Sequence, residues 1–239
     1  MNKKLKDWMY NEFNQVGVDY SENETVNEYD SEMESFRDYE QEVEAFLEKL
    51  NISDPGKLTV IDIGCGTGAF SIHAAKHFKQ IHAVDVSKEM INAASAKAEA
   101  KNIKNIEFHN SGFLQFQPKM EADIINTKWA FHHLPDYWKQ VGLLNMNKML
   151  KLDGIMFMSD VVFKFDPDYE ANTDTLIRQL SKDFSEDFIN EVKIHIRDEY
   201  STFDWVLQGL IERAGFSIEQ MNTDDVLESE YVCRKVQSL

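Results

Sequence analysis

The chain has 239 residues, and its hydrophobic content of 43% is enough for one generous domain or a domain with a cap. Its formal net charge of -17 argues against an extended tRNA, rRNA or DNA footprint, because nucleic-acid binding draws most of its affinity from Lys and Arg. Two cysteines, Cys65 and Cys233, cannot build a disulfide framework, and no apolar run approaches the length of a membrane span. No apolar stretch of the kind that a secretion signal needs follows Lys3, Lys4 and Lys6. We therefore expect a cytoplasmic protein that binds neither a membrane nor an extended nucleic acid.

The first part of the chain, residues 1–55, is predicted to form a helical cover. Between Asp19 and Lys49 it carries twelve acidic and two basic side chains, a bias that disordered tails also show. Apolar residues nevertheless recur there at helical spacing, which predicts an amphipathic helix over 31–51: Met33, Phe36, Val43, Phe46, Leu47 and Leu50. Residues 1–30 hold too many aromatic side chains for a solvated tail, so we expect them to fold over the main domain.

After Pro55 and Gly56, short apolar runs alternate with helical stretches, a pattern typical of βαβ units and a parallel sheet. Gly215 is predicted to end a helical stripe that starts at Phe203. Strands are expected near 58–63, 81–86, 105–109, 122–127, 155–162, 216–221 and 230–236. The pattern thus predicts an α/β core made of residues 56–163 and 201–239.

Residues 164–200 interrupt this alternation with a polar segment that has helix-like stretches at 170–182 and 185–197. An insertion at this point follows the carboxyl end of a parallel strand, where open α/β sheets bind their ligands. We interpret it as a helical cap that contributes to substrate choice. A surface insertion without function is the alternative.

Residues 60–68 read Val-Ile-Asp-Ile-Gly-Cys-Gly-Thr-Gly, a buried strand that ends in a glycine turn. Gly64, Gly66 and Gly68 suit a backbone that approaches a ligand closely before a helix begins. Gly64, Gly66 and Ala69 also match the G-x-G-x-x-G/A fingerprint of dinucleotide-binding sites. Asp85 ends the next strand 21 residues after Gly64, where a carboxylate can accept hydrogen bonds from a ribose. These residues predict a nucleoside ligand and leave its identity open.

Five further segments carry a resemblance to a known family. They are Val26-Asn-Glu-Tyr-Asp30, Asp85-Val-Ser-Lys-Glu-Met90, Ala122-Asp-Ile-Ile-Asn126, Ala130-Phe-His-His-Leu-Pro-Asp136 and Met149-Leu-Lys-Leu-Asp-Gly154. With the glycine turn, they resemble the motifs of the class I S-adenosylmethionine (SAM)-dependent methyltransferases, in the same order. The resemblance implies a Rossmann-like three-layer sandwich, with a seven-stranded, mostly parallel sheet whose last strand is antiparallel. It also implies SAM as cofactor and S-adenosylhomocysteine as co-product.

The resemblance further implies which residues bind the cofactor. The acid at Asp85 binds both ribose hydroxyls, Val86 and Met90 pack on the adenine, and Tyr29 lies near the methionine part. Asp62 either orients the turn or meets the amino group of the cofactor through water. Where many relatives carry Gly-Asp after the third strand, this chain has Ser111-Gly-Phe113, so adenine is expected to meet the backbone there. The predicted cofactor set is Tyr29, Asp62, Gly64, Cys65, Gly66, Asp85, Val86, Met90, Gly112, Phe113 and Lys128.

Three residues are candidates for the chemistry on the acceptor side. His132 follows the fourth strand and has an ordinary pKa that suits proton transfer, although the paired histidines can also serve only to shape the loop. Asp160 is a charge in an apolar strand, which indicates a partner or a site. Tyr20 offers a hydroxyl in the segment expected to close over the site, or packs there. Adjacent histidines diverge in direction, so no metal site is expected.

These observations predict a methyltransferase that moves a methyl group from SAM to a small-molecule acceptor by in-line displacement. A nicotinamide-dependent oxidoreductase and a non-catalytic SAM-binding protein remain as alternatives. The sequence leaves open the acceptor, the atom methylated and the oligomeric state.

Overall fold

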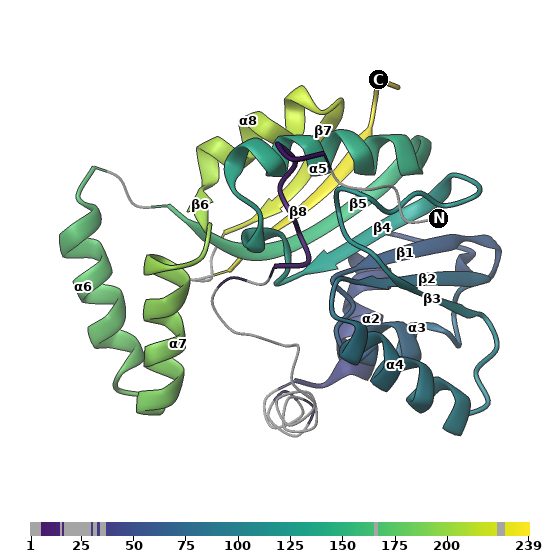
Figure 1. The fold of residues 1–239 in the computed structure, drawn as a ribbon, viewed down its shortest axis with the longest axis horizontal. Helices are drawn as coiled ribbons and strands as arrows, with labels where there is room; N and C mark the ends of the chain where they lie inside the picture. The colour runs from purple at the N-terminus through teal and green to yellow at the C-terminus, as the bar shows by residue number, and fades with distance from the viewer. Residues whose placement is uncertain are drawn as a thin grey trace.

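The computed structural model of this chain describes residues 6–14, 16, 30, 33, 37–164, 167–223 and 228–239, and its centre is an eight-stranded sheet (Figure 1). The strands are β1 (Thr59–Ile63), β2 (Gln80–Asp85), β3 (Ile106–Asn110), β4 (Ala122–Lys128), β5 (Leu150–Phe163), β6 (Thr202–Phe203), β7 (Phe216–Asn222) and β8 (Glu228–Lys235). Seven of them lie side by side in the order β3-β2-β1-β4-β5-β8-β7, and β6 pairs with β5.

The strand directions confirm the predicted Rossmann-like fold. Neighbouring strands from β3 through β5 are parallel, and β8 runs antiparallel to both β5 and β7. All seven predicted strands are present, and β5 begins earlier than predicted, directly after the preceding helix. The eighth strand, β6, was not predicted, because two residues are too short to show an alternating pattern.

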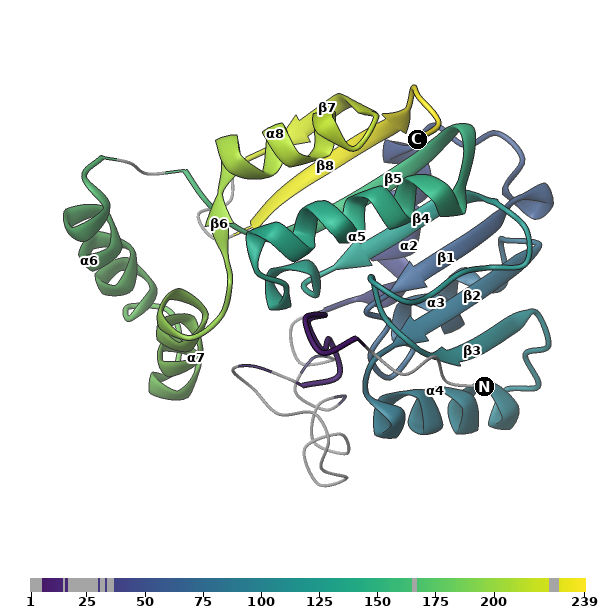
Figure 2. The same cartoon turned by 45° about the horizontal axis from the view of Figure 1, so that its top comes forward.

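Helices cover both faces of the sheet (Figure 2). One face carries α5 (Asp136–Met149) and α8 (Asp204–Arg213), whose Leu143 and Leu207 belong to one buried cluster with Ile125 of β4. The other face carries α2 (Tyr39–Lys49), α3 (Ala69–Ala74) and α4 (Lys88–Ala100). Two short 3-10 helices complete the core, η1 (Pro55–Lys57) and η2 (Phe131–His133). This arrangement covers β1 and β4 on both sides, so most residues of each strand are buried.

Helix α2 covers the later part of the helix that was predicted over 31–51. It begins at Tyr39 because the side chain of Asp38 accepts hydrogen bonds from the backbone N–H groups of Glu40 and Gln41. Val43 and Phe46 are buried against the sheet, as the periodicity predicted. Residues 31, 32 and 34–36 lie outside the described residues.

Two helices follow β5 and project from the body of the molecule (Figure 1). They are α6 (Tyr169–Leu180) and α7 (Glu186–Arg197), within three residues of the predicted helices. After α7 the chain returns to the sheet, where Tyr200 N donates to His132 O at 3.0 Å. The role of 164–200 as a cap, and the division into 1–55, 56–163 with 201–239, and 164–200, stay predictions. Among the described residues, no helix is both long enough and apolar enough to cross a membrane.

Candidate active site

The glycine turn connects β1 to α3 in a conformation that glycine favours. Gly64, Gly66 and Gly68 have φ angles of 77°, 53° and 77°, in the left-handed region. A Cβ on Gly64 would lie 2.2 Å from the Cβ of Ala130, so the turn needs glycine to approach the segment after β4. Gly64 N also donates to Val84 O at 2.8 Å. The turn is thereby held between the ends of β2 and β4.

Asp85 lies beside this turn at the end of β2. One carboxylate oxygen accepts from Gly66 N at 2.9 Å, and the other accepts from Ser87 N at 2.8 Å. Burial raises the pKa of Asp85, against these hydrogen bonds, which lower it. Each carboxylate oxygen can accept a second hydrogen bond, so the group can also serve a ligand.

A cavity of about 850 Å³ opens next to Asp85, and we call it the β2-side cavity. Asp85 is the acidic residue that β2 contributes to this cavity, and the backbone forms part of the wall at Gly66 and Gly112. Apolar side chains form much of the remaining wall: Ile63, Val86, Met90, Phe113, Ala130 and Leu134. An apolar lining with an acid beside it suits a nucleoside.

Glu12 is a site residue that the sequence analysis missed. It reaches into the β2-side cavity from the N-terminal segment, and its Oε2 accepts from Leu114 N at 2.9 Å. Its Oε1 is buried and has no hydrogen-bond partner in the part of the chain that the structure describes. Burial raises the pKa of Glu12 to about 7, against backbone hydrogen bonds that lower it. Glu12 thus supplies a carboxyl group beside Gly112, where the sequence lacks the usual acid.

A second cavity, of about 860 Å³, lies on the other side of the glycine turn, and we call it the α2-side cavity. Its cations are paired: Arg37 bonds Glu42 through two nitrogens, each at 2.7 Å. The Lys128 Nζ lies 3.9 Å from Glu42, and Lys49 pairs with Glu230. Neighbouring charges of both signs suit the end of a ligand that carries an ammonium and a carboxylate.

The two cavities share four lining residues: Gly64, Gly66, Lys128 and Trp129. Trp129 has a φ angle of 52°, which is strained for a bulky residue. Its ring contacts the Arg37 guanidinium and the Lys128 ammonium, each 4.9 Å from the ring centroid. Strain of this kind is retained when the surroundings hold the residue in place, often at functional sites. Because the two cavities share these lining residues, one ligand that passes the glycine turn can occupy both.

Asp62 lines the α2-side cavity, and its bonds favour the first of its two predicted roles. It accepts from Ser71 Oγ at 2.6 Å and from Asn126 Nδ2 at 2.8 Å. Burial raises its pKa to about 6, although both bonds lower it. Asp62 therefore ties β1 to α3 and β4 beside the glycine turn.

His132 and Asp160 line neither cavity. The Nδ1 atom of His132 lies 2.5 Å from Asp160 Oδ1, and its Nε2 lies 3.2 Å from Glu199 Oε2. Glu199 also pairs with His195 of α7. Burial lowers the pKa of His132, but Asp160 and Glu199 outweigh it and raise the pKa to about 9. Both ring nitrogens of this buried imidazolium face carboxylates, which suits a link between core and insertion better than a base.

The neighbouring His133 does line the β2-side cavity. Burial and the charge of His132 lower the pKa of His133 to about 4, so its imidazole is neutral at neutral pH. Two adjacent histidines thus have opposite environments, a difference that no sequence signal could have shown.

All of the predicted cofactor residues that the structure describes line one or both cavities. Asp62 and Cys65 line the α2-side cavity, and the others line the β2-side cavity or both. Tyr20 and Tyr29 lie outside the described residues. Asp30, which follows Tyr29, accepts from Thr67 Oγ1 in the glycine turn and pairs with Lys97.

Comparison with known proteins agrees with this geometry. A family described as "Methyltransferase domain" matches residues 55–226. An uncharacterized methyltransferase of Bacillus pumilus is 30% identical over 166 residues, which are 68% of this chain and 72% of the relative. A SAM-dependent methyltransferase structure from Clostridium acetobutylicum has a TM-score of 0.66 at 14% identity, covering 89% of this chain and 98% of that one. Magnesium protoporphyrin IX methyltransferase from Synechocystis, solved with bound S-adenosylhomocysteine, has a TM-score of 0.59 at 17% identity, covering 82% and 83%.

The structural neighbours share the fold, and the family match assigns the activity class that the glycine turn alone left open. The chain therefore belongs to the methyltransferase-domain family and is a class I SAM-dependent methyltransferase.

Proposed function

We propose that this enzyme transfers a methyl group from SAM to a small-molecule acceptor by in-line displacement. The observation that carries the proposal is the pair of cavities that meet at Gly64, Gly66, Lys128 and Trp129. One has the lining of a nucleoside site, and the other places charges of both signs together, as the amino-acid end of the same ligand requires.

The residues of the β2-side cavity would hold the adenosine part. Asp85 would accept the ribose hydroxyls, since each of its oxygens has capacity beyond the bonds to Gly66 and Ser87. Val86 and Met90 would pack on the adenine plane, with Phe113 beside them. Glu12 would serve as the polar partner at the adenine edge, because its Oε1 is buried without a partner in the described chain.

The residues of the α2-side cavity would hold the methionine part. Lys128 and Arg37 offer donors to a carboxylate, and Glu42 offers an acceptor to an ammonium group. Gly64, Cys65 and Gly66 would let the ligand lie against the turn backbone, and Asp62 would keep that turn in place through Ser71 and Asn126.

The cofactor supplies a methyl group on a sulfonium centre, which is an electrophile without further activation. The protein therefore chiefly has to align the acceptor and exclude water. His132 and Asp160 would act as positioning residues, because they fix the segment after β4: Phe131 N donates to Asp160 Oδ2 at 2.7 Å. A contact of Tyr20 with the acceptor stays a prediction.

Two features support a small acceptor. The net charge of -17 disfavours an extended nucleic acid. The chain also inserts α6 and α7 after β5, on the side where the parallel strands end, and an insertion there can enclose a small molecule.

Calorimetry with S-adenosylhomocysteine and with NAD tests the cofactor site. We expect binding of S-adenosylhomocysteine that Asp85→Asn weakens at least about tenfold, because charged hydrogen bonds to the ribose are lost. Asp54→Asn, a change at an exposed carboxylate, is the matched control and should bind as the wild type does. Binding of NAD alone would refute the assignment.

The acceptor class needs a separate experiment. Methyl-labelled SAM is incubated with the enzyme and a bacterial extract divided by ultrafiltration into small molecules and macromolecules. We expect enzyme-dependent label in the small-molecule fraction, reduced in Asp85→Asn. Label confined to retained protein or nucleic acid would contradict the proposed acceptor.

A further inference from the structure

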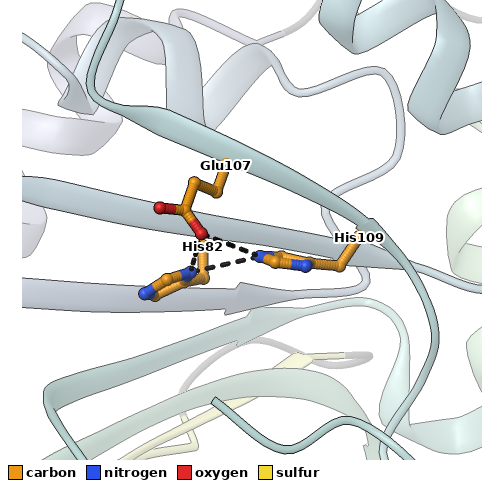
Figure 3. Close-up of side chains that lie close together, drawn as sticks. All are labelled: His82, Glu107 and His109. Carbon is orange, nitrogen blue, oxygen red and sulfur yellow. Dashed lines mark hydrogen bonds and ion pairs between the residues drawn. The ribbon is translucent and has the colours of Figure 1, made fainter. Parts of the chain in front are cut away.

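Two strands at the edge of the sheet carry a cluster of metal-ligating side chains that lines neither cavity (Figure 3). His82 of β2 is paired in register with Glu107 of β3, and His109 follows two residues later on β3. Side chains alternate between the faces of a strand, so all three project from the same face of the sheet. Figure 3 shows one nitrogen of each imidazole and the carboxylate of Glu107 turned toward one another.

The spacing of the three donor atoms matches a metal site. His82 Nδ1 lies 3.1 Å from His109 Nε2 and 3.5 Å from Glu107 Oε2, and His109 Nε2 lies 3.9 Å from the same oxygen. The point in the plane of this triangle that is equidistant from its corners lies about 2.05 Å from each donor, so a tetrahedral ion just off this plane needs the donors to close in slightly. Bonds from zinc to imidazole nitrogen and carboxylate oxygen are about 2.0–2.2 Å long. The side chains need little movement to surround an ion.

The surroundings also suit metal binding. A histidine must be neutral to bind an ion, and burial disfavours the charged form of both rings, which lowers the pKa of His82 and of His109. The Phe116 ring lies 4.8 Å from the His109 ring and 6.3 Å from the His82 ring, which shields one side. The Glu107 side chain is 58% exposed, so the cluster is open to solvent at this residue.

We propose that His82, Glu107 and His109 bind one divalent transition-metal ion of the zinc class, with water as the fourth ligand. Two imidazoles and one carboxylate favour zinc over Mg²⁺ or Ca²⁺, which require mainly oxygen ligands. The ion joins the edge strand β3 to β2. The next residue, Asn110, donates to Asp85 O at 3.2 Å and Val86 O at 2.8 Å, so the ion stabilises the strand ends that carry the cofactor residues.

This proposal departs from the expectation of no metal site, which considered only His132 and His133. The contact of His82 with His109 has a second explanation, a hydrogen bond between two neutral rings. That bond needs a proton between the two nitrogens. Metal binding needs the lone pairs of both nitrogens, so the ring that donates in the bond must then carry its proton on its other nitrogen. Glu107 separates the explanations, because it contributes to an ion site and not to the ring–ring bond.

The test measures uptake of Zn²⁺ by the metal-free protein, by calorimetry and by elemental analysis after dialysis. We expect the wild type to bind one more Zn²⁺ than His82→Asn/His109→Asn, and Glu107→Gln to bind that ion at least about tenfold more weakly. Glu107→Gln changes an exposed side chain and should fold, which circular dichroism verifies. Mg²⁺ should not compete. Co²⁺ in the wild type should give a visible spectrum of tetrahedral type that the double variant lacks.

Controls address the other histidines. His77→Asn removes a histidine from outside the cluster and should not change Zn²⁺ uptake. His195→Asn removes a member of the other candidate group, formed with His132 and Glu199, and should leave the Zn²⁺ that depends on His82 in place. Equal Zn²⁺ stoichiometry and affinity in wild type, Glu107→Gln and the double variant would overturn the proposal. Loss of Zn²⁺ only in His195→Asn would overturn it too.

Discussion

Replacing Glu12 by Gln should change how the stability of this enzyme depends on pH. Glu12 is 6% exposed, and burial raises its pKa from 4.5 to about 7. A carboxyl with a raised pKa binds its proton more tightly in the folded state than in the unfolded state. The free energy of unfolding therefore falls as pH rises between the two pKa values, and the full difference is about 3.4 kcal/mol. Glutamine has no proton to lose and removes this dependence.

The assay is urea denaturation of wild type and Glu12→Gln, without ligand, at pH 5.5 and 8.0. From the two pKa values, the wild type should lose about 2 kcal/mol more than the variant between these pH values. Other titrating groups, such as Asp62 and His133, are common to both proteins and cancel in the comparison. Glu99→Gln, at an exposed position on α4, should behave as the wild type does. Parallel pH profiles for the wild type and Glu12→Gln would refute the proposed environment of Glu12.

Three further predictions concern the turn and the link to α7. Gly64→Ala should abolish binding of S-adenosylhomocysteine in calorimetry, because the new Cβ would collide with Ala130. The double variant Gly64→Ala/Ala130→Gly should recover part of the binding, because only the backbone strain at residue 64 remains, which costs about 1–2 kcal/mol. If Ala130→Gly restores nothing, the contact is not the cause. Glu199→Gln should lower the pKa of His132, followed by NMR of the ring protons, and an unchanged pKa would contradict the pairing. Because its pKa is raised to about 9, His132 should contribute fully to the free energy of unfolding below pH 6.5, and this contribution should disappear as pH passes 9. Asp160→Asn should therefore lower the free energy of unfolding by about 3–5 kcal/mol at pH 6. A smaller loss at pH 6 than at pH 10, measured by urea denaturation, would contradict this pairing.

The sequence by itself determined the fold class and a nucleoside ligand, and its resemblance to a known family identified that ligand as SAM. Alternating apolar runs specify strands and helices through local periodicity, which is why all seven predicted strands are present. The glycine turn and Asp85 are also local features, since each depends on backbone geometry at the end of one strand. The motifs that follow β4 and α5 also resemble those of SAM-dependent methyltransferases, and the family match over residues 55–226 agrees with this resemblance.

Only the tertiary structure decided which side chains meet. Glu12 bonds Leu114 across 102 positions, and nothing near either residue indicates the pairing. His132 and His133 are neighbours in sequence, but one is held between carboxylates and the other faces a cavity. His82 reaches His109 because β2 and β3 are adjacent in one register. Local patterns encode elements, whereas contacts between distant residues depend on how those elements pack, so the fold could be predicted and much of the site could not.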